Sequence, residues 1–251
     1  MRISVIIPTL NEERTLPVTL AQTLPLGFDE ILVVDGGSSD GTQNITERLD
    51  VGGSRLDTDP PNAGGGTSLV TRRSSLVAVL ISPPGRARQM NVGARAATGD
   101  VLLFLHADTL LPTNARTEIE SALAEAGCLG GRFDVRFERD AGPGWLISRM
   151  INLRSRLTGI ATGDQAIFVR RSTFDALGGF ADVPLMEDID LTKRLKRQGR
   201  IAALRAQVTS SFRRWEAAGP IRTILLMWTL RFLYWIGVSP VRLKALYRDE
   251  R

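Results

Sequence analysis

The feature that most constrains the fold of this chain is an apolar run, residues 101–105, that stops abruptly at His106-Ala107-Asp108. Five consecutive apolar residues are typical of a strand that is buried on both faces, as in a parallel sheet. In open α/β sheets, ligands bind outside the carboxyl ends of the strands. A carboxylate at that position can hold a hard divalent cation against a phosphate. It can also simply begin a turn, so Asp108 alone leaves both interpretations open.

Strand and helix signals alternate along the first half of the chain. A helix is predicted to begin near Asn11, and apolar residues recur at helical spacing over residues 86–98. Repetition of strand and helix predicts an α/β fold, with a doubly wound, mainly parallel central sheet and helices on both faces. Further short apolar runs predict strands at residues 3–8, 31–35 and 77–82.

The remainder of the chain is less regular. Residues 132–138 and part of 166–171 alternate with a period of two, which predicts half-exposed or edge strands, and residues 186–198 are a predicted helix. Residues 51–76 are rich in glycine, proline and polar side chains without periodicity. Loops of this length are commonly functional or disordered, so we expect a mobile insertion here.

Composition limits the classes of protein to which the chain can belong. A chain of 251 residues can bury a substantial core. Cys128 is the only cysteine, which excludes an intrachain disulfide and a multi-thiolate metal site and fits a reducing, cytoplasmic compartment. The net charge is +5, but residues 191–251 hold 14 of the 32 lysines and arginines and only 3 of the 27 acids. A basic C-terminal part implies an anionic partner; without interleaved aromatics or a binding motif, nucleic acid is not expected.

Carboxylates at other element ends carry the same ambiguity as Asp108. Asp35 ends a predicted strand beside a glycine-rich turn, where it can accept hydrogen bonds from a nucleobase or ribose, or cap the turn. Glu187 and Asp188 open a predicted helix, where a carboxylate can cap the helix or act as a general base. Asp164 and Gln165 can orient a polyol or satisfy loop backbone. The chain has no Gly-x-Gly-x-x-Gly after its first strand, which counts against a dinucleotide-binding dehydrogenase.

Several segments together resemble a known family. The finer pattern combines Gly85-Arg86-Ala87-Arg88-Gln89-Met90-Asn91 with His106-Ala107-Asp108 and Gly163-Asp164-Gln165. In this order, and over about residues 3–200, the chain resembles GT-A-fold, family-2 glycosyltransferases, and the finer pattern resembles a bacterial subfamily of them. The matching segments are residues 5–13, 33–42, 85–93, 104–108 and 178–190.

The resemblance implies an inverting glycosyltransferase that moves a sugar from a UDP- or GDP-linked donor to an acceptor hydroxyl. It makes Asp188 the general base with Glu187 beside it, and Asp108 the ligand of Mg²⁺ or Mn²⁺ at the donor diphosphate. It places Asp164 and Gln165 at the acceptor. It implies a donor site formed by Pro8, Thr9, Glu12, Asp35, Arg86 or Arg88, His106 and Ala107.

The chain departs from the family pattern at two places. His106 stands where the family usually has an aspartate; it can ligate Mn²⁺ but suits Mg²⁺ poorly, and it can equally be structural. Processive members carry Gln-x-x-Arg-Trp, whereas this chain retains Arg214-Trp215 without the glutamine. We therefore expect transfer of a single sugar, with Arg214 and Trp215 near the donor or acceptor.

The C-terminal part is predicted to form an amphipathic, basic helical tail, residues 216–251, after a glycosyltransferase domain over residues 1–215. Residues 221–238 are long and apolar, but Arg231 near the middle would be costly inside a bilayer. A helix lying on an anionic membrane and a helix packed on the sheet both remain open. Membrane contact would suit a lipid-linked acceptor and a peripheral location on the inner face of the cell membrane.

Two other functions fit parts of the pattern. A sugar-nucleotide-forming nucleotidyltransferase shares the α/β sheet and the metal carboxylates, but its glycine- and basic-rich loop after the first strand is missing. A degenerate, non-catalytic, membrane-associated interaction protein would explain the missing aspartate at His106.

Overall fold

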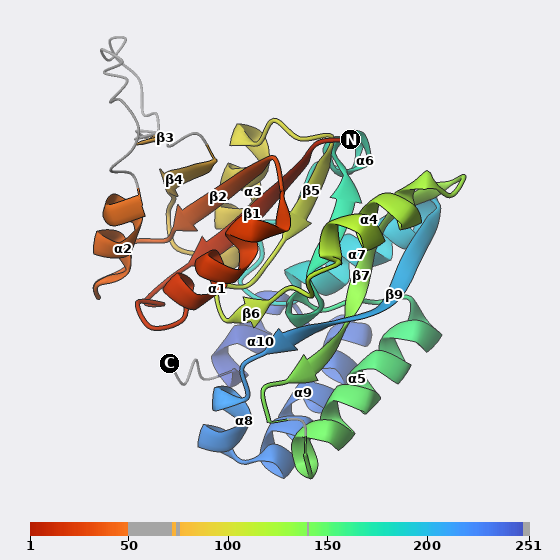
Figure 1. The fold of residues 1–251 in the computed structure, drawn as a ribbon. Coiled ribbons are helices and arrows are strands. Elements are labelled where there is room, and N and C mark those ends of the chain that lie inside the picture. The colour runs from red at the N-terminus through yellow and green to blue at the C-terminus, as the bar shows by residue number, and fades with distance from the viewer. Residues whose placement is uncertain (50–71, 74–75, 140, 248–251) are drawn as a thin grey trace, which may run out of the picture.

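A computed structural model of the chain describes residues 1–49, 72–73, 76–139 and 141–247. The insertion predicted at residues 51–76 lies almost wholly outside these described residues. Within them, a nine-stranded sheet has the order β3-β4-β2-β1-β5-β8-β7-β9-β6 (Figure 1). The strands are β1 (Ile3–Thr9), β2 (Glu30–Asp35), β3 (Arg72–Arg73), β4 (Val77–Ile81), β5 (Val101–Phe104), β6 (Thr109–Leu110), β7 (Cys128–Phe137), β8 (Ile167–Arg170) and β9 (Arg200–Ser210).

The central strands confirm the predicted α/β class. β4, β2, β1 and β5 are parallel neighbours, β8 is antiparallel to both β5 and β7, and β9 is parallel to β7. Helices cover both faces of the sheet (Figure 1). They are α1 (Leu16–Thr23), α2 (Thr42–Leu49), α3 (Arg86–Ala96), α4 (Ala115–Ala124), α5 (Pro143–Thr158), α6 (Arg171–Ala176), α7 (Glu187–Gln198), α8 (Arg213–Ala218), α9 (Pro220–Trp235) and α10 (Pro240–Leu246), with short 3₁₀ turns η1 (Leu24–Leu26) and η2 (Gly163–Gln165).

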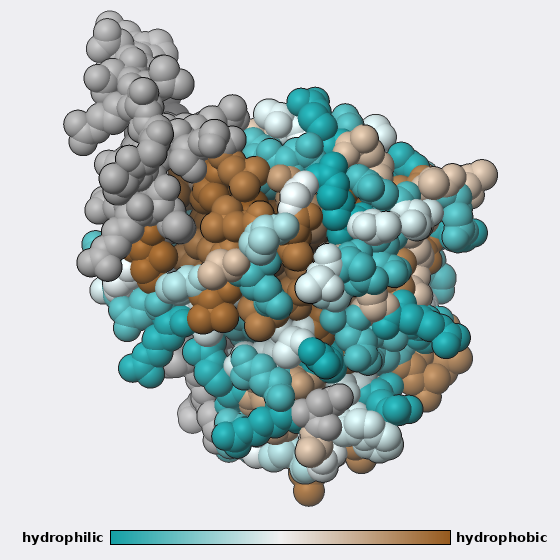
Figure 2. All heavy atoms as spheres, in the orientation of Figure 1, coloured by the Kyte–Doolittle hydropathy of each residue, from teal (hydrophilic) through white to brown (hydrophobic). Residues whose placement is uncertain are grey.

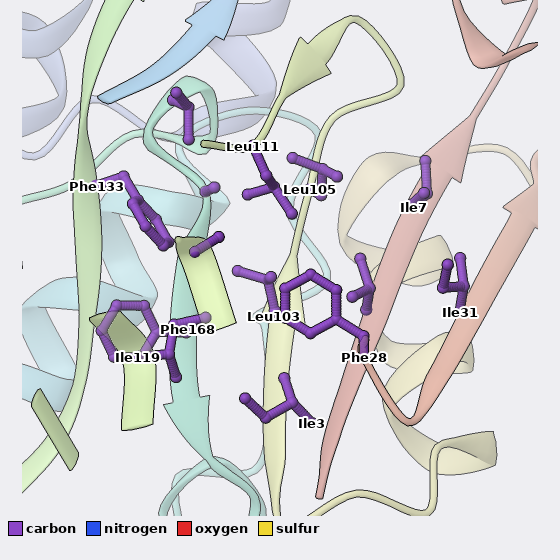
Figure 3. Close-up of a cluster of buried hydrophobic side chains, with 14 of the residues drawn as sticks. Ile3, Ile7, Phe28, Ile31, Leu103, Leu105, Leu111, Ile119, Phe133 and Phe168 are labelled. Carbon is purple, nitrogen blue, oxygen red and sulfur yellow. The ribbon is translucent and has the colours of Figure 1, made fainter. Parts of the chain in front are cut away.

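Two hydrophobic clusters hold these layers together. On one face, Leu103 and Phe168 of the sheet pack with Ile119 of α4 (Figure 3). Leu16 of α1 belongs to the same cluster. On the other face, Phe104 meets Phe174 and Phe180 with ring centroids 5.2 and 4.8 Å apart, beside α3 and α7. Leu103 and Phe104 are neighbours in β5 but belong to opposite clusters, so alternate residues of a strand hold opposite helical layers. Burial of each such side chain stabilises the fold by about 1.5–3 kcal/mol.

The prediction that the strands near residues 132–138 and 166–171 are half-exposed or at an edge is wrong. β7 and β8 are buried strands inside the sheet. The charged residues of β7 cause the misleading alternation: Arg132 and Asp134 are buried, and their side chains form an ion pair of 2.5 Å. Arg156 of α5 adds a second contact to Asp134, at 2.6 Å. Ion pairing therefore allows polar positions to lie under α5.

The helix predicted near Asn11 begins later, at Leu16. Asn11 instead has a positive φ of 56°, and its side-chain oxygen accepts a hydrogen bond from the Ser39 amide at 2.9 Å. The loop after β1 is thus tied to the loop after β2.

α9 is neither fully packed nor fully exposed. Leu230 is completely buried in a cluster with Met186 and with Leu243 of α10. One side of α9 carries apolar side chains that are each more than half exposed, and we name them the α9 stripe: Ile221, Leu225, Trp228, Phe232 and Trp235. Among the described residues, no helix combines the length and apolarity needed to span a membrane.

Candidate functional site

The candidate site lies where the carboxyl ends of the parallel strands meet. Thr9 and Asp35 are register partners at the ends of β1 and β2, and β5 ends beside β1. Because β8 is antiparallel to β5, with Ile167 opposite Phe104, the η2 turn before β8 reaches the same edge of the sheet. Chain reversal in β8 thus brings Gly163–Gln165 next to the residues that follow β5.

Asp35 is held by its own turn. Its buried carboxylate accepts hydrogen bonds from the Gly37 and Ser38 amides, the Ser38 hydroxyl and the Gln43 amide group. The turn-capping role that the sequence left open is therefore present. A carboxylate has about four acceptor positions, so capping occupies most of its capacity.

Gln89 connects the two strand ends and was not singled out from the sequence. Its buried amide nitrogen donates to the carbonyl oxygens of Thr9 and Val34, at 2.7 and 2.9 Å. A Cβ on Gly36 would lie 2.9 Å from the same side chain, so the turn after β2 has room only for glycine unless Gln89 moves. The sequence feature that could have indicated a role for Gln89 is its place in residues 85–91, a segment that carries the family resemblance.

Arg213 joins Glu12 to Asp108. One of its terminal nitrogens lies 3.4 Å from the Glu12 carboxylate and 3.8 Å from the Asp108 carboxylate. The sequence directed attention to the neighbouring Arg214, whose side chain lies outside the described part of the structure. The contact brings a residue of the expected nucleoside set and the expected metal ligand to one place.

The start of α7 supplies two nearly buried carboxylates. Asp188 accepts a hydrogen bond from the Gly163 amide at 2.8 Å, and Glu187 lies 3.5 Å from a terminal nitrogen of Arg86. Asp190, in the same turn, pairs instead with Arg194 one turn later. Of these three carboxylates, Glu187 and Asp188 therefore belong to the site, whereas Asp190 stabilises the helix.

Burial and the neighbouring Glu187 carboxylate together raise the pKa of Asp188 to about 6, although Arg86, His106 and the Gly163 amide act in the opposite direction. Burial acts against the charge of Arg86 as well, but Glu187 and Asp188 raise its pKa above the usual range. Asp188 therefore changes protonation close to neutral pH, as a general base requires.

His106 faces the η2 turn. Its Nδ1 lies 3.3 Å from Oδ1 of Asp164, and its Nε2 is buried with no hydrogen-bond partner among the described residues. A Cβ on Gly163 would lie 2.2 Å from that Nε2 and 2.9 Å from the Asp188 carboxylate. His106, Gly163 and Asp188 are thus in direct contact.

Gln165 satisfies one backbone group of its own turn and one of β7. Its side-chain oxygen accepts from the Thr162 amide, and its side-chain nitrogen donates to the Phe133 carbonyl, both at 3.3 Å. The side chain is completely buried. Its contacts are those of the loop-supporting role that the sequence left open.

Each of the other predicted site residues has contacts of its own. Pro8 lies in β1, and the Ala107 carbonyl accepts a hydrogen bond from Thr19 of α1 at 2.7 Å. Arg88 is exposed and pairs with Asp182 at 2.8 Å. The Trp215 ring is stacked on the Phe212 ring, with 6.3 Å between their centroids, and it packs edge-on against the Phe137 ring, with 5.9 Å between centroids.

A divalent cation fits this site only with help from a substrate. Within the described residues, no three His, Cys, Asp or Glu side chains gather into a metal-binding group. Asp108 is a partly exposed carboxylate at the rim of the site. Mg²⁺ in phosphate-transfer sites is commonly held by one or two carboxylates together with substrate phosphates and water. Asp108 suits such a site.

Comparison with known proteins identifies the family of the chain. The sequence profile of the family described as Glycosyl transferase family 2 matches residues 4–176. The chain is 29% identical over 222 residues to the "Probable glycosyltransferase YdaM" of Bacillus subtilis (strain 168), which covers 79% of this chain and 47% of that protein. It is 28% identical over 192 residues to the undecaprenyl-phosphate 4-deoxy-4-formamido-L-arabinose transferase of Klebsiella pneumoniae subsp. pneumoniae, covering 70% and 51%. The chain thus spans about half the length of the curated relatives it matches.

Solved structures share the fold. The mannosyltransferase PcManGT from Pyrobaculum calidifontis, in complex with GDP-Man and Mn²⁺, aligns with a TM-score of 0.61 at 20% identity. The alignment covers 83% of this chain and 56% of that one. At this level of identity the likeness concerns the fold alone.

Proposed function

This chain belongs to glycosyl transferase family 2, and on that premise we propose that it transfers a single sugar from a nucleoside-diphosphate sugar to an acceptor hydroxyl, inverting the anomeric carbon. One observation carries the proposal: the buried Asp188, with a pKa near 6, lies at the same strand edge as Asp108. A base and a phosphate-side carboxylate at one edge are the two groups that this reaction needs.

In the proposed reaction, Asp188 takes the proton of the acceptor hydroxyl. The acceptor oxygen then forms a bond to the anomeric carbon while the bond from that carbon to the nucleoside diphosphate breaks, and the electron pair leaves with the diphosphate. Attack from the face opposite the leaving group inverts the configuration. A divalent cation held by Asp108 would neutralise charge on the departing diphosphate.

The donor side of the proposal uses the residues around the ends of β1 and β2. Pro8, Thr9, Glu12 and Asp35 form the nucleoside site, which Gln89 holds in place by joining the two strand ends. Arg86 is a better candidate than Arg88 for binding the donor phosphates. The Arg86 guanidinium contacts Glu187 within the site, whereas Arg88 pairs with Asp182 outside it. The PcManGT complex with GDP-Man and Mn²⁺ supports a nucleotide-sugar donor and Mn²⁺.

The acceptor side uses the η2 turn. Asp164 is proposed to orient the acceptor, and Gln165 supports the turn. Trp215 is proposed to border the acceptor. The proposal that Arg214 lies near the donor or acceptor rests on the sequence alone. His106 is proposed to position the turn, since both of its ring nitrogens face Asp164 and Gly163. Asp108 is then the proposed protein ligand of the metal.

We further propose that the protein is peripheral on the inner face of a cell membrane. The α9 stripe presents exposed tryptophan and phenylalanine side chains beside a basic C-terminal part. Such a face suits a helix lying in the interface of an anionic membrane. The Klebsiella relative, named as an undecaprenyl-phosphate transferase, supports a lipid-linked acceptor.

Binding of nucleoside diphosphates tests the donor site without knowledge of the sugar. UDP and GDP, each with Mn²⁺, should be compared by thermal unfolding, because a ligand that binds only the native state raises its stability. We expect at least one to raise Tm by several degrees, and Asp35→Ala to abolish the shift. An unchanged Tm with both nucleotides at millimolar concentration would contradict the proposal.

A further inference from the structure

A largely apolar groove lies between α5 and α9. Its volume is about 440 Å³. Asp164, which pairs with His106, also lines the groove, so the groove reaches the vicinity of the candidate base. Most of its lining side chains are apolar, among them Ile151 and Leu157 of α5 and Met227 and Trp228 of α9.

Two arginines stand out among these apolar walls. Arg154 of α5 donates from one terminal nitrogen to the Ile160 carbonyl at 3.4 Å. Its Nε and other terminal nitrogen are buried and have no hydrogen-bond partner among the described residues. A buried donor without a partner carries a desolvation cost that no hydrogen bond repays. The lining therefore contains unsatisfied donors that a bound acceptor group could satisfy.

The second arginine, Arg231 of α9, lies close enough to Arg154 for the two charges to repel. Burial lowers the pKa of Arg154 to about 9, helped by the repulsion of Arg231 and Arg132 and opposed by Asp164. Burial also lowers the pKa of Arg231, although Asp164 and Asp188 attract it. The carboxylates therefore do not fully compensate the two guanidinium charges, whereas an additional anion between them would.

The groove opens onto an apolar surface. Trp228 belongs both to the groove lining and to the α9 stripe. On the opposite side, Leu153 and Leu157 of α5 line the groove and are each more than half exposed, and Leu146 continues this edge. Figure 2 shows hydrophobic residues at the lower right of the view, over the position of α5 in Figure 1. An apolar chain could therefore pass from this surface into the groove along Trp228, Leu153 and Leu157.

We propose that the groove between α5 and α9 binds the acceptor, a lipid whose headgroup carries a phosphate beside the hydroxyl that receives the sugar. The apolar chain lies along the walls of the groove, the phosphate lies between Arg154 and Arg231, and the hydroxyl points toward Asp188. The inference rests on the proposed glycosyltransferase function and adds the chemical class of its acceptor. A free phosphate ion would leave the apolar walls in water, so the observations favour a lipid.

Dodecyl phosphate, below its micellar concentration, is the probe for this site. Isothermal titration of the full chain should show binding at least tenfold tighter than for dodecyl maltoside, which has the chain but no charge, or for inorganic phosphate, which has the charge but no chain. Equal affinity for both dodecyl compounds would overturn the role of the arginines. Equal affinity for both phosphates would overturn the lipid and leave a site for free phosphate.

Arg154→Met tests the headgroup contact, with Arg149→Met on the same helix as its matched control, since Arg149 is exposed and lies over the ring of Trp145. Arg154→Met should weaken binding of dodecyl phosphate at least tenfold, Arg154→Lys should weaken it less, and Arg149→Met should leave it unchanged. A loss of the same size in Arg149→Met would show a general charge effect and refute the assignment.

Stability separates binding from a structural role. Because Arg154 carries buried, unsatisfied donors, the ligand-free Arg154→Met variant should melt at or above the Tm of the unchanged protein. A fall of several degrees would mark Arg154 as a structural residue and contradict the proposal. Binding of a nucleoside diphosphate with Mn²⁺ should be the same in both proteins, so failure of the acceptor groove is distinguishable from failure of the donor site. Light scattering completes the test: a dimer that dodecyl phosphate does not dissociate would assign the groove to a second copy of the chain.

Discussion

The backbone amide of Gly163 donates a 2.8 Å hydrogen bond to Oδ2 of Asp188, and the same glycine touches the ring of His106. Three segments that are distant in the sequence, the end of β5, the η2 turn and the start of α7, therefore meet at one glycine. The hydrogen bond favours the charged form of Asp188 while burial opposes it. The hydrogen bond thus positions the candidate base and also contributes to its pKa.

A methyl group at position 163 should disrupt the site. In Gly163→Ala the added Cβ would lie 2.2 Å from Nε2 of His106, so the ring or the turn must move. Overpacking of this kind costs about 1–3 kcal/mol, which urea unfolding should detect. The double variant Gly163→Ala/His106→Ala is the control: it should recover part of the lost stability, and an additive loss would show that the ring is not the obstacle.

Asp188→Asn should inactivate the protein and yet stabilise it at alkaline pH. Loss of a general base typically lowers kcat about 10²–10⁴-fold. Because the native pKa of Asp188 is about 6 and the usual value is 3.8, ionisation of Asp188 lowers native stability as pH rises from about 4 to 6. The asparagine removes this loss, by up to ~3 kcal/mol, above pH 6 and not at pH 4.

Thermal unfolding at pH 4 and pH 8 checks this prediction, with Asp190→Asn as the matched control in the same helical turn. Asp190 pairs with Arg194, so its replacement should remove a contact and give no gain at pH 8. If Asp188→Asn were as destabilising at pH 8 as at pH 4, the raised pKa would be refuted.

Removal of Arg213 should make Asp108 more available to a cation. The Arg213 guanidinium lies 3.8 Å from Asp108, and both groups are partly exposed, so the effect of the charge is modest. We expect Arg213→Gln to tighten Mn²⁺ binding about two- to fivefold in the absence of nucleotide, as measured by electron paramagnetic resonance. Arg222→Gln, on α9, is the control, and weaker Mn²⁺ binding by Arg213→Gln would count against Asp108 as the ligand.

The α9 stripe should mediate membrane binding. Flotation with anionic phospholipid vesicles should recover the unchanged protein with the lipid, and Phe232→Glu/Trp235→Glu should lose most of this binding. Val18→Glu, at another apolar position that is more than half exposed, on α1, should bind like the unchanged protein. No flotation of the unchanged protein would sink the membrane assignment, whatever the variants do.

Local apolar runs were enough to predict the central strands, because β1, β2 and β5 are buried on both faces, β4 is buried over most of its length, and all four contain few polar residues. The same rule failed at β7, since a buried Arg132–Asp134 pair has the same alternating pattern as a half-exposed strand. Ion pairing is a tertiary contact that a single strand does not reveal. The α/β class therefore followed from the sequence, whereas the burial of its second half did not.

The candidate site divides in a similar way. Asp35, Asp108 and Asp188 follow recognisable strand or helix signals, so their types and places could be predicted. Gln89 and Arg213 act on segments 55 and 201 residues away, and no local pattern indicates such partners. Arg154 and Arg231 come together only because α5 and α9 face each other across the groove. Long-range packing supplied the parts that the sequence could not.

The most direct test of the account is the product released from nucleotide sugars in the presence of Mn²⁺ and a bacterial lipid extract. UDP-glucose, UDP-N-acetylglucosamine and GDP-mannose should be incubated with the full chain, and UDP, GDP and pyrophosphate measured. The account predicts lipid-dependent release of UDP or GDP, lost in Asp188→Asn and Asp108→Ala and kept in Asp190→Asn. Release of pyrophosphate would indicate a nucleotidyltransferase, and release unchanged in Asp188→Asn would contradict the central claim that Asp188 is the base.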